Sequence, residues 1–139
     1  MLPENTPRQI KRLAEFMKLH LDNPEGRNTV TAYGPGYFDI NQQRHVASLI
    51  LLPDRIIQGW GTAGFDALTE ADVETLRDLQ AEIVVLGTGP RQRFPAPGLL
   101  RPLIDARIGF EIMDLHAACR TYNILMAEGR KVAAALLID

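Results

Sequence analysis

Two strand-to-turn transitions in the last third of the chain constrain its fold more than any other feature. After Glu82, residues 83–86 are all apolar and run directly into Gly87-Thr88-Gly89. Residues 110–113 run into Asp114, a residue type that often caps the first turn of a helix. Strands that alternate with helices in this way are typical of sheets with parallel strands. The transitions therefore predict an α/β domain and the sheet edge at which both strands end.

The second half of the chain alternates helices with strands. Thr69 is expected to cap a helix whose Val73, Leu76 and Leu79 face a core. Pro102, inside the next expected helix, predicts a shifted start or a kink. The expected strands are 82–86, 110–113 and 131–138, and the later helices are 97–107 and 115–128. This order predicts parallel strands joined by crossover helices.

The first half of the chain has the pattern of antiparallel strands. Short strands are expected at 29–33, 37–40, 45–52 and 56–60, and a strand at 18–21 before them. The last four residues of 45–52 are all apolar, which predicts burial on both faces. Thr6 and Pro7 predict the start of a helix at 6–16.

Together these elements predict a layered single α/β domain at 17–139, preceded by an N-terminal helical extension at 1–16. Its central sheet is expected to be mixed. A β-α-β-α-β C-terminal half forms one part, and the N-terminal half supplies an additional antiparallel β section.

Composition narrows the functional classes. The 139 residues carry a net charge of −2, so no basic excess attracts nucleic acid. No apolar run approaches the roughly 20 residues that insert across a membrane. Cys119 is the sole cysteine and excludes a cysteine-based zinc site, and His20 and His45 are too far apart in sequence to suggest a metal. No cofactor is expected. The N-terminus has acidic residues and no apolar signal core, so a cytoplasmic location is expected.

The Gly87-Thr88-Gly89 turn is the first candidate for ligand binding. In open α/β sheets, ligands bind beyond the carboxyl ends of strands, where glycines let backbone N–H groups approach an anion. Arg91 and Arg93 follow and can hold a carboxylate or phosphate. However, Gln92 stands where the dinucleotide pattern has its third glycine, and nothing after Gly89 matches a P-loop. The favoured interpretation is a tight turn with two solvated arginines.

Asp114 and the helix after it are the second candidate. If the two preceding strands are parallel, Asp114 lies at the same sheet edge as Gly87. Cys119 near the helix N-terminus can have a lowered pKa, with His116 as a base, and Arg120 adds a cation. Because no third group orients this pair, the favoured interpretation is structural: Asp114 caps the helix, Cys119 packs in the core and His116 is exposed. No catalytic residue is assigned.

Two further features have both structural and functional interpretations. Glu111 falls in a strand expected to be central, where a bare carboxylate is costly. An ion pair is favoured over a pocket-lining role, and the candidate partners are Arg101, Arg107 and Arg120. The aromatic residues of the first half are expected to pack in the core rather than form an exposed binding surface. These residues are Tyr33, Tyr37, Phe38 and Trp60.

Several stretches of the chain resemble a known family. They are Val85–Gly89, Phe94-Pro95, Gly109–Asp114, Ala117–Asn123 and Leu125–Leu137. The resemblance is to a small Mth-type α/β domain family of unknown biochemical activity. This family includes the mitochondrial complex I (NADH:ubiquinone oxidoreductase) assembly factor 3 and the adipogenesis-associated Mth-type domain protein. The similarity runs from about Lys18 to Leu137. Residues 1–16 fall outside it, as an accessory helix or as a segment before a start at Met17.

The resemblance implies a layered α/β fold with a mixed central sheet and contributes no catalytic residues. Together with the absence of a complete catalytic set, it favours a non-enzymatic accessory or assembly-type protein that acts by binding a protein partner. The lack of a convincing mitochondrial presequence indicates a bacterial-type member. The alternative is a binder or enzyme for a small anionic metabolite at the edge formed by Gly87–Phe94 and Asp114–Arg120. The candidate ligand-binding residues are Gly87, Thr88, Gly89, Arg91, Arg93, Asp114 and Arg120.

Overall fold

The structure, a computed structural model, describes residues 10–11 and 26–139. The predicted strand at 18–21, and the predicted helix at 6–16 apart from residues 10 and 11, lie outside the described residues. In the described part, β1 (Val30–Gly34), β2 (Tyr37–Ile40) and β3 (Gln43–His45) form an antiparallel three-stranded sheet in that order. This sheet is the additional β section predicted for the N-terminal half.

The central sheet is five-stranded and mixed. Its order is β5-β4-β8-β6-β7, so β5 and β7 are the two edges. β6 runs parallel to both β7 and β8, whereas β4 runs antiparallel to β8 and β5. The strands are β4 (Leu49–Leu52), β5 (Arg55–Gln58), β6 (Ile83–Thr88), β7 (Gly109–Met113) and β8 (Val132–Leu137). The predicted mixed sheet is confirmed, with its parallel part in the second half of the chain.

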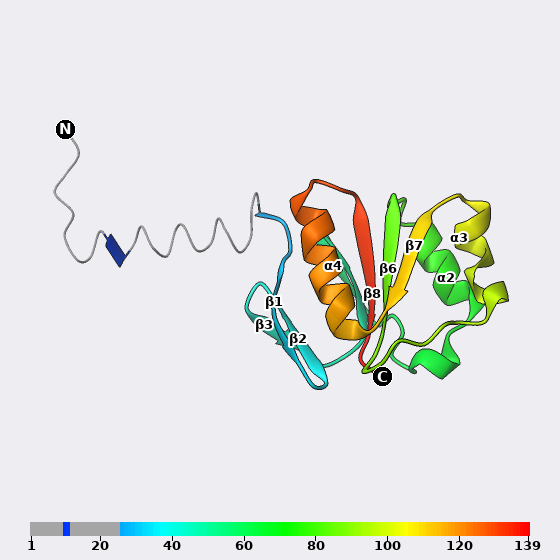
Figure 1. The fold of residues 1–139 in the computed structure, drawn as a ribbon, viewed down its shortest axis with the longest axis horizontal. Coiled ribbons are helices and arrows are strands. Elements are labelled where there is room, and N and C mark those ends of the chain that lie inside the picture. Colours follow the sequence, from blue (N-terminus) through cyan, green and yellow to red (C-terminus); the bar gives the residue numbers. More distant parts are fainter. Residues whose placement is uncertain (1–9, 12–25) are drawn as a thin grey trace.

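Helices cover both faces of this sheet (Figure 1). α4 (Leu115–Ala127) packs on one face, between the five-stranded sheet and the three-stranded sheet. α2 (Glu70–Arg77) and α3 (Arg101–Asp105) pack on the other face, with the 3-10 turns η2 (Phe65–Ala67) and η3 (Pro97–Leu100) beside them. The result is a layered α/β domain, as predicted.

Local residues set the helix ends where the sequence predicts them. Thr69 Oγ1 accepts the Asp72 N–H while the Asp72 carboxylate accepts the Thr69 N–H, which is a complete capping box. The Asp114 carboxylate accepts the Ala117 N–H at 2.9 Å and begins α4. Gly129, with φ of +79°, follows its end. Pro102 divides the predicted helix at 97–107 into η3 and the short α3.

The core has two halves, one on each side of β8. All six β8 residues are buried, and alternate side chains enter opposite halves. Ala134 and Leu136 face α4, whereas Ala135 and Leu137 face α2 and α3. β4 is likewise buried on both faces, as its apolar run predicts. Because these central strands are covered on both faces, the sheet is accessible for binding mainly at its edge strands and strand ends.

The predicted continuous strand at 45–52 is wrong. β3 ends at His45 and β4 begins at Leu49, and the two strands belong to different sheets. Between them Val46 is 70% exposed, and Ser48 Oγ accepts the Ile138 N–H at 2.9 Å. The apolar residues Val46 and Ala47 make the sequence look like one strand, although the chain crosses between layers there.

Candidate functional site

Gly87, the first residue of the predicted ligand-binding turn, lies in β6 and under α4. A Cβ atom at this position would lie 2.8 Å from Ala118 Cβ and 3.2 Å from Leu115 Cα. Both distances are shorter than ordinary van der Waals contact. The missing side chain therefore allows the first turns of α4 to pack directly on the strand.

Thr88 closes the loop that follows β6. Its side chain is fully buried, and Oγ1 lies 2.8 Å from the Arg91 carbonyl oxygen, to which it donates. Thr88 Oγ1 also accepts the Arg93 N–H at 2.9 Å. Gly89 then turns the chain at φ of +84°, where a Cβ would lie 2.8 Å from the backbone carbon of Asp139. The loop's hydrogen bonds and the close approach of the C-terminus explain these two residues.

The three candidate arginines have separate surroundings. Arg93 donates from Nε and Nη2 to the Thr88 carbonyl oxygen, at 3.2 and 2.8 Å, and its guanidinium lies 4.4 Å from the centre of the Phe65 ring. Arg120 Nη1 donates to the Tyr33 hydroxyl at 2.9 Å. Arg91 is exposed. Two of the three guanidinium groups are thus held by different parts of the fold.

The predicted sheet edge does carry a hollow, of about 250 Å³. Of the seven candidate residues, Gly89 and Asp114 line it, together with His116, Leu115 and neighbouring residues. His116 Nε2 lies 3.0 Å from the Gly34 carbonyl oxygen, and its ring stacks on Tyr33 with 4.5 Å between ring centres. Because a carbonyl oxygen only accepts, Nε2 is the donor in this contact. The side chain is half-buried rather than exposed as predicted.

Cys119 is a core residue, and the possibility of a lowered thiol pKa is wrong. Its side chain is fully buried on the inner side of α4. Burial raises the pKa of the thiol to about 12. Position near a helix N-terminus lowers a thiol pKa only where solvent or a cation stabilises the thiolate, and desolvation dominates here. The interpretation of Cys119 as core packing is confirmed.

Glu111 is exposed on the edge strand β7, so its expected place in a central strand is wrong. In the part of the chain that the structure describes, it forms no ion pair with the three arginines considered as partners. The sequence does not reveal this because a strand's place in the sheet depends on non-local pairing. Glu111 is therefore a solvated carboxylate beside an open sheet edge.

The aromatic residues of the first half divide into core and surface. Phe38 and Trp60 are buried, and Trp60 Nε1 donates to the Asp72 carbonyl oxygen at 3.0 Å. Tyr37 is half-buried beneath the Arg44 guanidinium, 3.8 Å from the ring centre. Tyr33 is 36% exposed, so the expectation of core packing is wrong for this residue.

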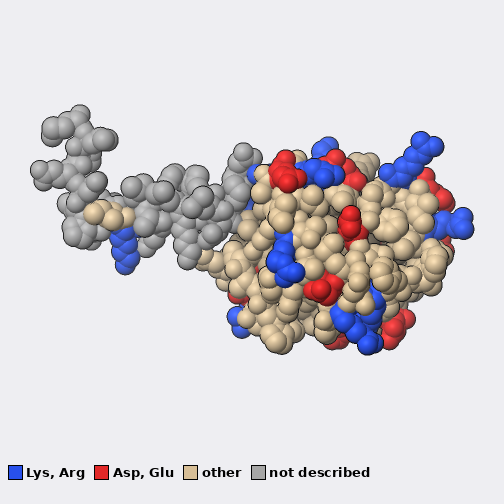
Figure 2. All heavy atoms as spheres, viewed as in Figure 1, with Lys and Arg blue, Asp and Glu red and all other residues tan. Residues whose placement is uncertain are grey.

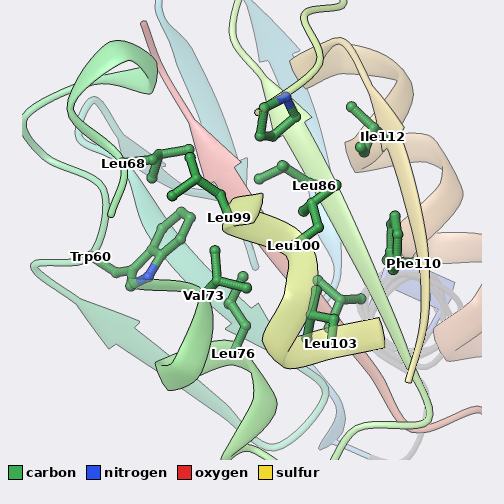
Figure 3. Close-up of a pocket in the computed structure, with 12 residues that line it drawn as sticks. Trp60, Leu68, Val73, Leu76, Leu86, Leu99, Leu100, Leu103, Phe110 and Ile112 are labelled. Carbon is green, nitrogen blue, oxygen red and sulfur yellow. The ribbon is translucent and has the colours of Figure 1, made fainter. Parts of the chain in front are cut away.

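Apolar side chains fill the space between the sheet and the α2 and α3 layer (Figure 3). Trp60, Leu99, Leu103 and Phe110 point toward one another there, and the remaining cavity measures about 10 Å³. A cavity of that size holds one water at most, and an apolar lining leaves it dry. It belongs to the core.

A second hollow, of about 360 Å³, lies at the opposite end of the sheet and was missed by sequence reasoning. Its basic lining residues are Arg27, Arg55, Arg130 and Lys131. They come from three separate segments of the chain, so no local motif joins them all. Arg27 Nη1 donates to the Met126 carbonyl oxygen, and Arg130 pairs with Glu82 at 2.8 Å. Cations near the last turn of a helix complement its dipole, which explains Arg27 beside the end of α4.

The charged surface is mixed in sign on the face that Figure 2 shows, where basic and acidic side chains are interspersed. Among the residues that the structure describes, no group of three or more histidine, cysteine or carboxylate side chains is placed to hold a metal ion. In the same residues, no helix combines the length and the apolarity that crossing a membrane requires.

The fold and its packed strand–turn edge define a class of small layered α/β domains. The solution structure of a Bordetella pertussis protein described as a Mth938-like domain is 34% identical, has a TM-score of 0.62, and the match covers 81% of this chain and 86% of that chain. A crystal structure from Bordetella parapertussis is 42% identical with a TM-score of 0.76, covering 81% and 97%. These structures confirm the fold.

Residues 30–137 match the family described as protein of unknown function (DUF498/DUF598), and the chain belongs to this family. Similar proteins include the "NADH dehydrogenase [ubiquinone] 1 alpha subcomplex assembly factor 3" of Bos taurus, which is 34% identical over 110 residues. That match covers 78% of this chain and 59% of the bovine protein, so the chain spans less than two thirds of this relative. An uncharacterized protein of Rhodobacter capsulatus is 33% identical over 114 residues, covering 81% and 86%.

Proposed function

We propose that this protein is a non-enzymatic accessory or assembly-type protein that acts by binding another protein. The observation that carries the proposal is its similarity to proteins named as assembly factors of NADH dehydrogenase, at 34% identity over 110 residues for the bovine protein and 33% for the human one. We also propose the cytoplasm as its compartment, with which the free, buried Cys119 is compatible.

The geometry of the sheet edge supports this proposal over catalysis. Gly87 is required by the packing of α4, and Thr88 by the hydrogen bonds of the next loop. Asp114 is engaged as a helix cap, and the Cys119 thiol is held protonated by burial. These side chains contribute to folding directly, so their presence requires no substrate.

Deletion of the gene tests the accessory role. The proposed client is the NADH dehydrogenase complex that the relatives' name indicates. Native gels would compare the amount of assembled complex in membranes of the deletion strain, the parent and a strain complemented with the full chain. The expected result is a loss of assembled complex that complementation restores, with unchanged amounts of an unrelated respiratory complex as control.

A pulldown then tests direct binding. The tagged full chain would be expressed at its native level, cross-linked in cells and purified beside a tagged, folded protein of similar size. The expected result is one or more proteins enriched over that control in every repeat. Failure to recover any such protein, together with normal assembly in the deletion strain, would refute the accessory function.

A small ligand at the predicted edge is the second candidate, favoured by the hollow of about 250 Å³ beside Asp114 and Gly89. This volume is just below the range of about 300–1,000 Å³ that is typical of ligand pockets. An anionic metabolite placed there would lie near the Asp114 carboxylate. Binding would therefore depend on cations that approach the edge from the surface, such as Arg91 and Arg120.

Thermal-shift screening with a library of small anionic metabolites tests this candidate. Asp114→Asn is an informative variant, because asparagine also caps helices while the repelling charge is removed. An anion that binds in the hollow should stabilise Asp114→Asn more than the wild type, and should stabilise the double variant Arg91→Ala/Arg120→Ala less. The candidate fails if no metabolite raises the melting temperature of the wild type.

A further inference from the structure

β7 has one edge that no other strand covers in the part of the chain that the structure describes. Backbone groups alternate in direction along a strand. The Ile83 N–H donates to the Lys131 carbonyl oxygen, so the backbone groups of Ile83 point from β6 toward β8. When this alternation is followed along β6 and across the register with β7, the backbone groups of Phe110 and Ile112 point away from the sheet. Gln92 Nε2 agrees with this, because it donates to the outward Ile112 carbonyl oxygen at 2.9 Å.

Among the described residues, three backbone groups of this edge have no hydrogen-bond partner: the N–H and carbonyl of Phe110 and the N–H of Ile112. Unpaired groups in a row form a template for an added strand. Their neighbours in the chain, Gly109, Glu111 and Met113, direct their backbone groups toward β6 and are already paired. The open edge is therefore short and defined in register.

The side chains of β7 give each side of this edge a different chemistry. Phe110 and Ile112 are half-buried, and they line the same apolar space as the leucines of η3 and α3 (Figure 3). Glu111 points to the other face and is exposed, without an ion pair among the described residues. Along β7, an apolar side chain (Phe110), an acidic one (Glu111) and a second apolar one (Ile112) therefore follow one another.

We propose that the β7 edge is a docking site for an extended segment of a partner protein, which adds to the sheet as a sixth strand. The segment would place a lysine or arginine opposite Glu111 and an apolar residue on each side of it. The outward groups of Phe110 and Ile112 supply backbone hydrogen bonds, and the alternating side chains supply specificity. This inference rests on the proposed protein-binding function and assigns it a surface.

A second copy of this chain is a poorer occupant of the same edge. Two antiparallel β7 strands that use the outward groups of Phe110 and Ile112 pair with most overlap when centred on Glu111. That arrangement places two carboxylates directly opposite each other, which is destabilising. A charge on an edge strand is a common means of preventing self-association. The same charge attracts a basic segment.

Two synthetic peptides of eight residues test the proposal with the full chain. One has Val-Lys-Val at its centre and the other has Val-Glu-Val, with identical polar flanks. In amide NMR titrations, the lysine peptide is expected to shift the Phe110 and Ile112 signals most and slow their hydrogen exchange. It should bind about threefold more tightly than the glutamate peptide, which is the scale of an exposed cross-strand charge pair.

Charge reversal provides the matched control. Glu111→Lys should reverse the preference between the two peptides, because the side chain is exposed and the fold does not depend on its charge. Glu128→Lys changes an exposed carboxylate at the end of α4 and should leave the preference unchanged. No shift of the Phe110 and Ile112 amides with either peptide overturns the proposal, as does an unchanged preference in Glu111→Lys.

The outcomes also separate this docking site from the broader function. A native partner that binds wild type and Glu111→Lys equally would remove the β7 site and leave the protein-binding function in place. Sedimentation analysis tests the other possible occupant, a second copy of this chain. A wild-type dimer that slows exchange at the Phe110 and Ile112 amides would show that a second copy, rather than a basic segment, occupies the edge and would overturn the proposal.

Discussion

Substitution of Gly87 by alanine tests the close approach of α4 to β6. The added Cβ would lie 2.8 Å from Ala118 Cβ and 3.2 Å from Leu115 Cα, and neither atom can rotate away. α4 must therefore move outward, although its inner side is buried in the core. Overpacking of this kind costs about 1–3 kcal/mol, and the stiffer unfolded chain returns about 0.4–1 kcal/mol. We expect a net loss of about 1–2 kcal/mol in the free energy of unfolding.

Gly98→Ala is the matched control, because a Cβ at Gly98 meets nothing within 4 Å. It should be neutral or stabilising by about 0.5 kcal/mol. Urea unfolding followed by circular dichroism measures both variants. If Gly87→Ala is as stable as Gly98→Ala, the packing role assigned to Gly87 is refuted. The double variant Gly87→Ala/Ala118→Gly should lose less stability than the two single variants lose when their losses are added, since Ala118→Gly removes the closest contact of the new Cβ.

Three further outcomes follow from buried or paired groups. Thr88→Val should lower the free energy of unfolding by about 1–3 kcal/mol, because it leaves loop groups unpaired. Its control, Thr75→Val on the exposed side of α2, should change the free energy of unfolding by less than about 0.5 kcal/mol. Urea unfolding measures both. Burial raises the pKa of Cys119 to about 12, so at pH 8 iodoacetamide should label the native chain on the order of a hundredfold more slowly than the urea-unfolded chain; equal rates would contradict its burial. The hydrogen bond from Arg130 lowers the pKa of Glu82 below its usual value of 4.5. The ionised Glu82 therefore stabilises the fold fully above pH 4.5, and this contribution is lost as pH falls through the lower pKa of the folded state. Unfolding curves of Glu82→Gln should show a weaker loss of stability in that pH range.

Features encoded by neighbouring residues could be predicted from the sequence. The cap at Thr69 requires only a side chain three residues before the N–H it accepts, and the same holds for Asp114. The apolar run at 83–86 identifies a buried strand, because strands covered on both faces lose their polar alternation. Parallel pairing of β6 with β7 follows from the intervening helix and was also predicted correctly. These elements sufficed to identify the α/β fold and the sheet edge.

Features that depend on distant pairing could not be predicted. β4 and β8 are adjacent in the sheet although about 80 residues separate them, and this pairing makes β7 an edge. Glu111 therefore looked like a central residue in need of a partner. The run at 45–52 was misread for a related reason, because apolar residues on either side of a crossing look continuous in the sequence. The candidate arginines were adjacent in sequence to the edge, but their guanidinium directions depend on Phe65 and Tyr33.

The contrast between the two kinds of edge residue bears on how such a domain acquires partners. Gly87, Thr88 and Asp114 are each required by helix packing, loop closure or capping, so their presence in another chain of this fold follows from stability alone and predicts no shared ligand. Glu111 is exposed and forms no ion pair with another described residue, and exposed substitutions usually change stability by less than about 0.5 kcal/mol. Charge at position 111 can therefore change the preferred partner at little cost to the fold, so a shared fold is compatible with different partners.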